Sequence, residues 1–329
     1  MRPFSGLASL LAAVTLLSIS LAASDPKAPL GLDAYRPTPP DNRLTPAKIA
    51  LGRRLFHDRR LSRDGSIACV TCHDPARAFA DGRVVAVGVD KLAGQRNVPT
   101  IINRAYGKSS FWDGRAASLE EQVVQPLLDP REMASTPEAV LAMLRRDASY
   151  RRHFTAAFER EPQWDDVARA LASYVRTIRS GDSRFDRFRH GASSALSEQE
   201  QRGMRLFLGK ANCWFCHAGP NFTDERFHNT GVAFRDERIV DVGRFAVTQG
   251  PADRGAFKTP TLREAVRTAP YMHDGSLPTL DAVIDYYDRG GNANPDLDNL
   301  IQPLRLSVDE KRALIAFLRS LSGRVVEGT

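Results

Sequence analysis

The sequence predicts a mainly α-helical protein made of two similar domains related by internal duplication. Segments of the first half recur in order in the second: 47–56 (AKIALGRRLF) matches 198–207 (EQEQRGMRLF), and 170–176 (ALASYVR) resembles 313–319 (ALIAFLR). Such self-similarity is typical of a repeated structural unit. Strand signals are few, and the one short candidate, 84–89, is interpreted as a loop ribbon.

The opening helix of each half carries its own start signal. Thr45 followed by Pro46 is an N-cap with proline at the first helical position. Ser197 and Glu200 have the spacing of a capping box. Apolar side chains then recur at helical spacing on one face of each segment, which indicates amphipathic helices.

The closing helices are predicted over 167–178 and 309–321, where apolar residues again follow a helical period. Gly52 and Gly203 lie on the apolar faces of the two opening helices. Because glycine has no side chain, both positions allow close contact with another helix. We therefore expect the first and last helices of each half to pack together, with a linker near 181–196.

All four cysteines lie in two copies of one five-residue word, 69–73 (CVTCH) and 213–217 (CWFCH). C-x-x-C-H is the attachment signature of c-type haem: two thiols bond the porphyrin, and the adjacent histidine ligates the iron. A Cys₄ zinc site, a thioredoxin-like motif or two disulfides would leave the paired histidines unexplained. We expect two cytochrome c-like domains with two covalently bound haem c groups, held by Cys69, Cys72, His73, Cys213, Cys216 and His217.

The first 23 residues have the pattern of a secretory signal peptide. Arg2 is the charged start, 7–21 is an apolar run, and Ala22 and Ala23 offer cleavage sites. The run is short for a membrane span, although an uncleaved anchor is the alternative, and no later segment is apolar enough to cross a bilayer. We predict a periplasmic protein with an N-terminal haem domain over 24–185 and a C-terminal one over 186–329.

The chain is basic, with a formal net charge of +7. The excess is scattered arginine rather than a concentrated stripe, which is typical of solvated helix faces and of arginines that meet haem propionates. A nucleic-acid interface needs a basic stripe, with aromatics for single strands, and the sequence has neither. Docking of a small acidic redox partner is compatible with this charge.

The whole mature chain resembles the bacterial dihaem cytochrome c peroxidases, and among them the MauG-like branch. Besides both haem words, the matching motifs are 111–116 (FWDGRA), 129–133 (DPREM), 257–263 (FKTPTLR) and 271–275 (YMHDG). The family usually has asparagine at the position of Asp129. The resemblance implies that the first haem is peroxidatic and that the second transfers electrons.

The resemblance also implies roles for four residues around the first haem. Glu132 matches the distal acid that moves a proton across peroxide. Gln122 matches a distal hydrogen-bonding residue, and Pro126 matches a proline over the open iron face. Trp112 matches a tryptophan that relays electrons between the haems. From the residues alone, Glu132 is equally a helix-start carboxylate and Trp112 is a core aromatic.

In related enzymes a loop histidine closes the first iron in the resting state. The matching stretch here, 85–90 (VAVGVD), has no histidine, and Val89 takes its place. This resembles the family members whose first haem is always open.

The second haem is expected to have His217 on one side and Tyr287 on the other. Better-known peroxidases carry methionine at the position of Tyr287, whereas MauG-like members carry tyrosine. A phenolate is a hard anion that favours oxidised iron. The alternative is that Tyr287 is a core residue and Met272 is the ligand.

The resemblance further implies one calcium ion between the domains, bound at Asn97, Thr268 and Pro270. The remaining histidines have no matching role and are expected to be surface or structural residues: His57, His153, His190 and His228.

The function implied is reduction of hydrogen peroxide with electrons from a small periplasmic cytochrome c or cupredoxin. The alternative is a MauG-like oxidase that uses a two-haem high-valent state to oxidise tryptophans of a partner protein. Members with that activity have a surface-side tryptophan two residues before the second haem word, where this chain has Ala211 and places Trp214 inside the word. A non-enzymatic electron carrier would need both irons closed, which the missing loop histidine opposes.

Overall fold

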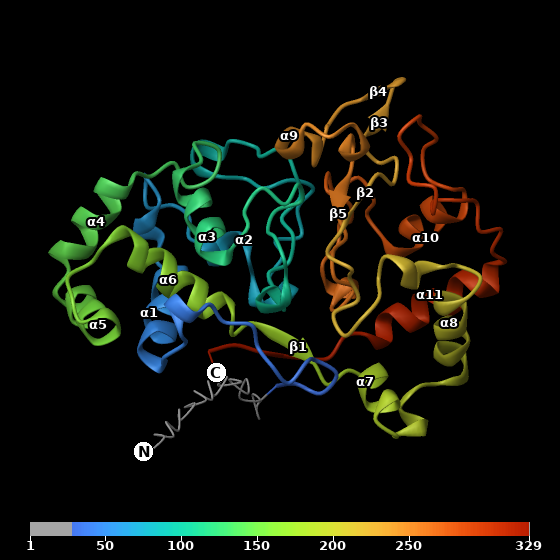
Figure 1. Cartoon of the computed structure of the whole chain (residues 1–329), viewed down its shortest axis with the longest axis horizontal. Coiled ribbons are helices and arrows are strands. Elements are labelled where there is room, and N and C mark those ends of the chain that lie inside the picture. Colours follow the sequence, from blue (N-terminus) through green and yellow to red (C-terminus); the bar gives the residue numbers. More distant parts are fainter. Residues whose placement is uncertain (1–27, 329) are drawn as a thin grey trace, which may run out of the picture.

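Two helical halves lie side by side in the computed structural model, which describes residues 28–328 (Figure 1). The expected signal peptide, 1–23, lies outside the described residues. The helices of the first half are α1 (Pro46–Phe56), α2 (Cys69–Cys72), α3 (Leu119–Leu128), α4 (Pro137–Arg146), α5 (Ala148–Phe158) and α6 (Trp164–Val175). Those of the second are α7 (Arg184–Arg189), α8 (Glu198–Leu208), α9 (Phe245–Thr248), α10 (Leu280–Asp288) and α11 (Val308–Ser320). Within 28–328, no helix combines the length and apolar character needed to cross a membrane.

Helices α1 and α6 pack tightly in the first half. Thr45 accepts a hydrogen bond from the backbone of Lys48, which confirms the predicted N-cap. A Cβ at Gly52 would overlap the carbonyl oxygen of Ala170 on α6, so glycine is required for this approach. The rings of Phe56 and Tyr174 lie 5.1 Å apart across the contact.

Helices α8 and α11 make the same kind of contact in the second half. The capping box at Ser197 and Glu200 is present as predicted. A Cβ at Gly203 would overlap the carbonyl oxygen of Ala313 on α11. The rings of Phe207 and Phe317 lie 5.2 Å apart. In both helix pairs, therefore, a glycine allows the close approach of the two helices and two aromatic rings lie close together across the contact.

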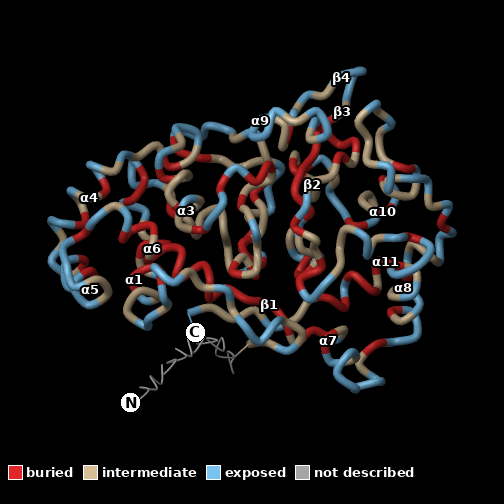
Figure 2. The backbone as a smooth tube through the Cα atoms, in the orientation of Figure 1, coloured by how far each residue is buried: buried red, intermediate tan, exposed pale blue. Residues whose placement is uncertain are grey.

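Each half has its own hydrophobic core, and Figure 2 shows buried segments on both sides of the molecule. The first core includes Leu51, Leu55 and Leu171, and the second includes Phe207, Leu314 and Phe317. Because both cores are built around the first and last helices of a half, those helices fix the positions of the loops that carry the haem words.

The strands are short and antiparallel. Within the described residues they form three pairs: β1 (Arg179–Gly181) with β6 (Arg324–Val326), β2 (Phe227–His228) with β5 (Phe257–Lys258), and β3 (Phe234–Arg235) with β4 (Arg238–Ile239). The 84–89 segment is a ribbon rather than a strand, with one bridge between Val87 and Ala93. Pair β1–β6 lies low between the halves in Figure 1 and brings a late segment of the chain back to the first half.

Candidate haem sites

The first haem word lines a cavity in the first half. One-turn helix α2 carries Cys69 and Cys72, and the hydroxyl of Thr71 accepts a hydrogen bond from Ala68 N at 3.0 Å, which fixes the start of the turn. Cys69, Cys72 and His73 all border about 640 Å³ of empty space, part of it open to solvent. The two free thiols and the imidazole are the donor set that a c-type haem requires.

His73 is oriented by a backbone carbonyl. Its Nδ1 lies 3.0 Å from the carbonyl oxygen of Phe79. A carbonyl only accepts hydrogen bonds, so Nδ1 carries the proton and Nε2 is left with a lone pair for a metal. Burial lowers the pKa of His73, which keeps the ring neutral. Sequence reasoning missed this support, because a backbone carbonyl leaves no signal in the residue types.

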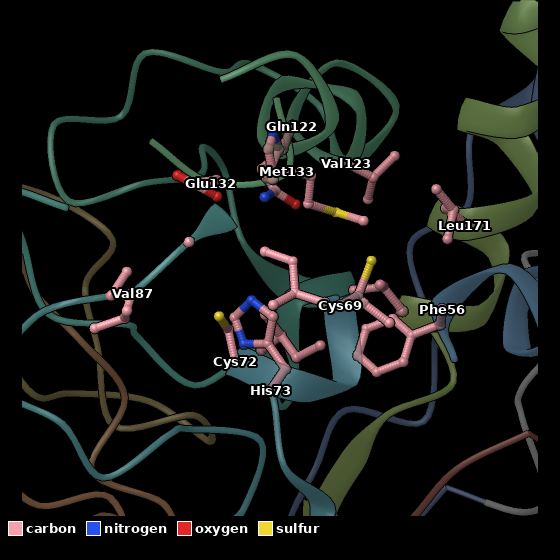
Figure 3. Close-up of a pocket in the computed structure, with 17 residues that line it drawn as sticks. Phe56, Cys69, Cys72, His73, Val87, Gln122, Val123, Glu132, Met133 and Leu171 are labelled. Atoms are coloured by element: carbon pink, nitrogen blue, oxygen red, sulfur yellow. The ribbon is translucent and has the colours of Figure 1, made fainter. Parts of the chain in front are cut away.

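The opposite wall of the cavity carries the predicted acid. Gln122 and Pro126 reach it from α3, and Glu132 reaches it from the loop after that helix. In Figure 3, Gln122 and Glu132 lie across the cavity from His73. Burial and the nearby negative charge of Asp129 together raise the pKa of Glu132 to about 7, against the opposing charge of Arg115. A carboxyl with this pKa both holds and releases a proton near neutral pH.

The ribbon 84–92 forms another wall. Ala86, Val87 and Gly88 line the cavity, whereas Val89 is 1 % exposed and is buried behind it. Among the described residues, His73 is the only histidine lining this cavity. Met133, which the sequence did not single out, lies beside Glu132 and also lines the cavity (Figure 3).

The second haem word has the same histidine support. Cys213 lies in a short 3₁₀ turn, and Nδ1 of His217 lies 3.0 Å from the carbonyl oxygen of Phe222. Burial lowers the pKa of His217 and leaves Nε2 available, as at His73. This half therefore offers a second set of two thiols and one neutral imidazole.

Tyr287 lies on α10 close to the second haem word. Burial raises the pKa of its phenol, and the neighbouring Tyr286, Cys213 and Cys216 raise it further, so the hydroxyl keeps its proton in the free chain. Met272 lies in the loop before α10 with φ at +73°. The structure thus brings Tyr287 near the cysteines that the sequence assigned to the same haem.

His228 is held between two carboxylates. Its Nδ1 lies 2.6 Å from Asp298 and its Nε2 lies 3.0 Å from Asp224. The thiol of Cys216 and these two carboxylates raise the pKa of His228 to about 10. Cys216, Asp224 and His228 are close enough to hold a metal ion in the free chain, but Cys216 belongs to the haem word. The expectation of a structural role for His228 agrees with its two partners.

Trp112 lies where the two halves meet. Its indole donates a hydrogen bond to the carbonyl oxygen of Asn97 at 2.9 Å. Its own carbonyl accepts a hydrogen bond from the backbone of Lys258, on β5 of the second half, at 2.8 Å. The backbone N–H of Asn97 also donates to the carbonyl of His273 at 2.7 Å, which places this expected calcium ligand at the same boundary.

The other two expected calcium residues, Thr268 and Pro270, lie in the loop before α10, and the hydroxyl of Thr268 donates to the carbonyl of Ala265. Trp214 is 41 % exposed and stacks on Phe215 with ring centroids 4.6 Å apart. An exposed aromatic pair thus lies between the two cysteines of the second haem word.

Comparisons with known proteins show what the chain is similar to. A family model described as di-haem cytochrome c peroxidase matches residues 46–194. The chain is 42 % identical to methylamine utilization protein MauG of Methylorubrum extorquens, over 87 % of this chain and 81 % of that protein. It is 39 % identical to cytochrome-c peroxidase IdrP1 of a Pseudomonas species, over 96 % and 90 %. A crystal structure of a MauG-like protein associated with microbial copper homeostasis has a TM-score of 0.83 and 35 % identity, covering 88 % and 93 %.

Proposed function

Because this chain belongs to the di-haem cytochrome c peroxidase family, we propose that it is a periplasmic enzyme that reduces hydrogen peroxide in its first half with electrons passed from its second. It is a haem peroxidase, and so an oxidoreductase. The observation that carries the finer proposal is the half-buried carboxyl of Glu132, with a pKa near neutrality, across a cavity from His73.

The residues present fit two haem c groups. Cys69 and Cys72 would form the thioether bonds of the first group and His73 would ligate its iron. In the second half Cys213 and Cys216 would form those bonds, with His217 and Tyr287 as ligands. The haems, when bound, supply the redox chemistry. Support comes from the free thiols beside two imidazoles whose Nε2 atoms are left available.

The proposed task of Glu132 is to take a proton from one oxygen of peroxide and return it to the other. Its raised pKa supports this, because a carboxyl titrating near 7 gains and loses a proton at little cost. Gln122 would orient peroxide by hydrogen bonding, and Pro126 would limit access to the same face. Both line the cavity together with Glu132.

We propose that Trp112 carries electrons between the halves. The indole N–H donates to the carbonyl oxygen of Asn97, and the backbone carbonyl of Trp112 accepts a hydrogen bond from Lys258 N–H, so both the ring and the backbone are held at the boundary. Calcium at Asn97, Thr268 and Pro270 is also part of the proposal, and the boundary position of Asn97 supports it. The carboxamide oxygen and carbonyls suit a hard cation.

The proposal also covers the domain boundaries, their origin, the location of the protein and its electron donor. The domains are 24–185 and 186–329, and the matched contacts at Gly52 and Gly203 support their origin by internal duplication. Export to the periplasm rests on the signal-like first 23 residues. The donor is a small cytochrome c or cupredoxin that docks on a basic protein.

A second candidate function is MauG-like oxidation of tryptophans on a partner protein. Two observations favour it: Tyr287 lies near the second haem word, and Trp214 is exposed on a stacked pair beside it. Electrons from a partner would then enter through Trp214. Ala211 in place of the usual tryptophan is the departure that makes this the second candidate.

One experiment separates the two functions. The haem-loaded chain is mixed with hydrogen peroxide and a reduced small c-type cytochrome, and oxidation of the cytochrome is followed by stopped-flow absorbance. Multiple rapid turnovers support the first function. A long-lived oxidised protein that discharges slowly into the cytochrome supports the second. Oxidation no faster than in Glu132→Gln would contradict the role of Glu132 in peroxide reduction.

A further inference from the structure

Glu132 lies in a turn between α3 and α4, 129–135, in which its own N–H donates to the carbonyl oxygen of Asp129 at 3.0 Å, and its carbonyl oxygen is held by a loop from elsewhere in the chain. We propose that the loop formed by residues 86–92 is a positioning clasp for Glu132, and that Gly88 is the residue on which the fit depends. This inference rests on the proposed function of Glu132 and concerns how its carboxyl is aimed.

Two consecutive carbonyls of the acid's segment each accept a hydrogen bond from a different part of the chain. Val89 N–H, in the clasp, donates to the carbonyl oxygen of Glu132 at 2.8 Å. Arg63 N–H, from the segment before α2, donates to the carbonyl oxygen of Met133 at 2.9 Å. The side chains of Arg63 and Asp90 form an ion pair that joins the two holding segments. The backbone at Glu132 is therefore fixed by two parts of the chain that are distant in sequence.

The clasp has a defined shape of its own. Gly88 N–H donates to the carbonyl of Leu92 at 2.9 Å, and Gly94 N–H donates to that of Ala86 at 2.8 Å. These bonds close the loop, so that Val89 N–H is presented at a fixed place. Ala86 and Val87 meanwhile line the cavity. One loop thus forms a wall of the cavity and holds the backbone of the acid that faces it.

Gly88 is needed for space rather than for backbone freedom. Its φ of −95° and ψ of −159° are extended values that any residue adopts. A Cβ built there would overlap the carbonyl oxygen of Arg131 and would lie 2.5 Å from that of Glu132. Since both obstacles are backbone atoms of the acid's segment, a methyl group must push that segment away or move the clasp.

Such a displacement changes where the carboxyl lies relative to its charged neighbours. Those facing it are Asp129 on its own segment, Arg115 from the loop before α3, and Cys69 and Cys72 on α2, which become neutral thioethers when haem is attached. A shift of the segment alters both the reach of the carboxyl and its titration. Misplacement of a reacting group by about 1 Å costs on the order of a hundredfold in rate.

The test compares Gly88→Ala with Gly94→Ala in the haem-loaded full chain. The three atoms nearest to a Cβ at Gly94 all belong to Ala86, the closest at 3.2 Å, so this variant alters the same ribbon with its nearest contacts away from the acid's segment. The titration of Glu132 is followed by the infrared C=O band of its protonated form, identified by its loss in Glu132→Gln. Peroxide turnover is measured in parallel.

We expect Gly88→Ala to shift the midpoint of that band and to slow turnover by roughly tenfold or more, whereas Gly94→Ala retains both. A folded Gly88→Ala protein with an unchanged band and unchanged turnover would overturn the clasp. If Glu132→Gln itself turns over normally, the proposed function fails instead, and the infrared comparison still reports on the clasp.

Val89→Pro provides a second route if Gly88→Ala does not fold. Val89 opens a 3₁₀ turn. Proline at this position removes the N–H that holds Glu132 and places its ring Cδ against the carbonyl oxygen of Glu132, which lies 2.8 Å from the Val89 nitrogen. Val89→Ala loses the same apolar packing but keeps the N–H and is the matched control. A shifted infrared midpoint in the proline variant and not in the alanine variant is expected, and equal midpoints would contradict the proposal.

Discussion

Arg96 in the first half and Asp241 in the second lie 145 positions apart and are joined by two hydrogen bonds, from Nε at 2.8 Å and from Nη2 at 2.9 Å. The third nitrogen of the same guanidinium, Nη1, donates to Asp113 at 2.7 Å. Bidentate pairs of this kind are both strong and geometrically specific. Because Asp113 directly follows Trp112, this arginine ties the segment of the proposed relay to the second half.

Replacing Asp241 by Asn is expected to destabilise the protein by about 1–3 kcal/mol, since hydrogen bonds to a charged, largely buried group are lost. Burial raises the pKa of Asp241, but the hydrogen bonds from Arg96 outweigh it and the pKa lies below its usual value. The pair's contribution is therefore present at neutral pH and is lost as the pH falls through the folded-state pKa. Denaturant unfolding at pH 7 and in acid measures this difference.

The control for that measurement is Asp309→Asn. Asp309 pairs with Arg312 on the exposed start of α11, where side-chain exposure is 72 % and 68 %. Such a pair contributes little. Equal losses in the two variants would mean that the Arg96–Asp241 contact does not hold the halves together.

Glu132→Gln is expected to slow peroxide reduction by a factor of roughly 10²–10⁴, the range for loss of an acid/base group. The amide keeps the size of the side chain but cannot accept the proton. Glu138→Gln, at the exposed start of α4, is the matched control and should retain the wild-type rate. Initial rates with a reduced cytochrome measure both. A Glu132→Gln enzyme as fast as the control would remove Glu132 from the reaction.

The rate should depend on pH through the same carboxyl. Only the ionised form takes a proton, so kcat/KM should rise with pH and level off above about 7, where burial and Asp129 have placed the pKa of Glu132. Asp129→Asn removes the negative charge that raises this pKa, so the rise should move to lower pH. Profiles of wild type, Asp129→Asn and Glu132→Gln test this, and a profile that Glu132→Gln leaves unchanged in shape contradicts it.

Tyr287→Phe is expected to change the electron paramagnetic resonance and visible spectra of the second haem in the oxidised protein, because the proposed phenolate ligand is lost. Met272→Leu should leave those spectra unchanged. The opposite pattern, with a silent Tyr287→Phe, would assign the ligand to Met272. Spectra of both variants as purified are sufficient, since no substrate is needed.

Local signals explain why the helix starts were predictable. Thr45 and Ser197 cap their own helices through neighbours a few residues away, and the structure contains both caps. The first closing helix is predicted over 167–178, but α6 ends at Val175. The prediction extends too far because Ile178 is apolar and fits the helical period, although it lies in the buried turn before β1. Periodicity reports burial and does not distinguish the end of a helix from a buried turn.

The cysteines and histidine of each haem site could be predicted because they are contiguous in the sequence. The hydrogen bonds that orient these histidines could not be predicted, because the carbonyls of Phe79 and Phe222 belong to the backbone and do not depend on residue type. The carboxylates around His228 come partly from Asp298, seventy positions away. Only the tertiary structure brings such a partner into contact.

The pairing of β1 with β6 also bears on how the polypeptide matures. Residues 324–326 complete a ribbon begun at 179–181. Glu327 and Gly328 then form hydrogen bonds with Tyr174, in the last turn of α6, and with Thr177, just after it. Because the chain is synthesised from its N-terminus, 179–181 stays without its partner strand until residues 324–326 have been made. A polypeptide that ends before residue 324 would lack the partner strand of 179–181 and the hydrogen bonds to Tyr174 and Thr177.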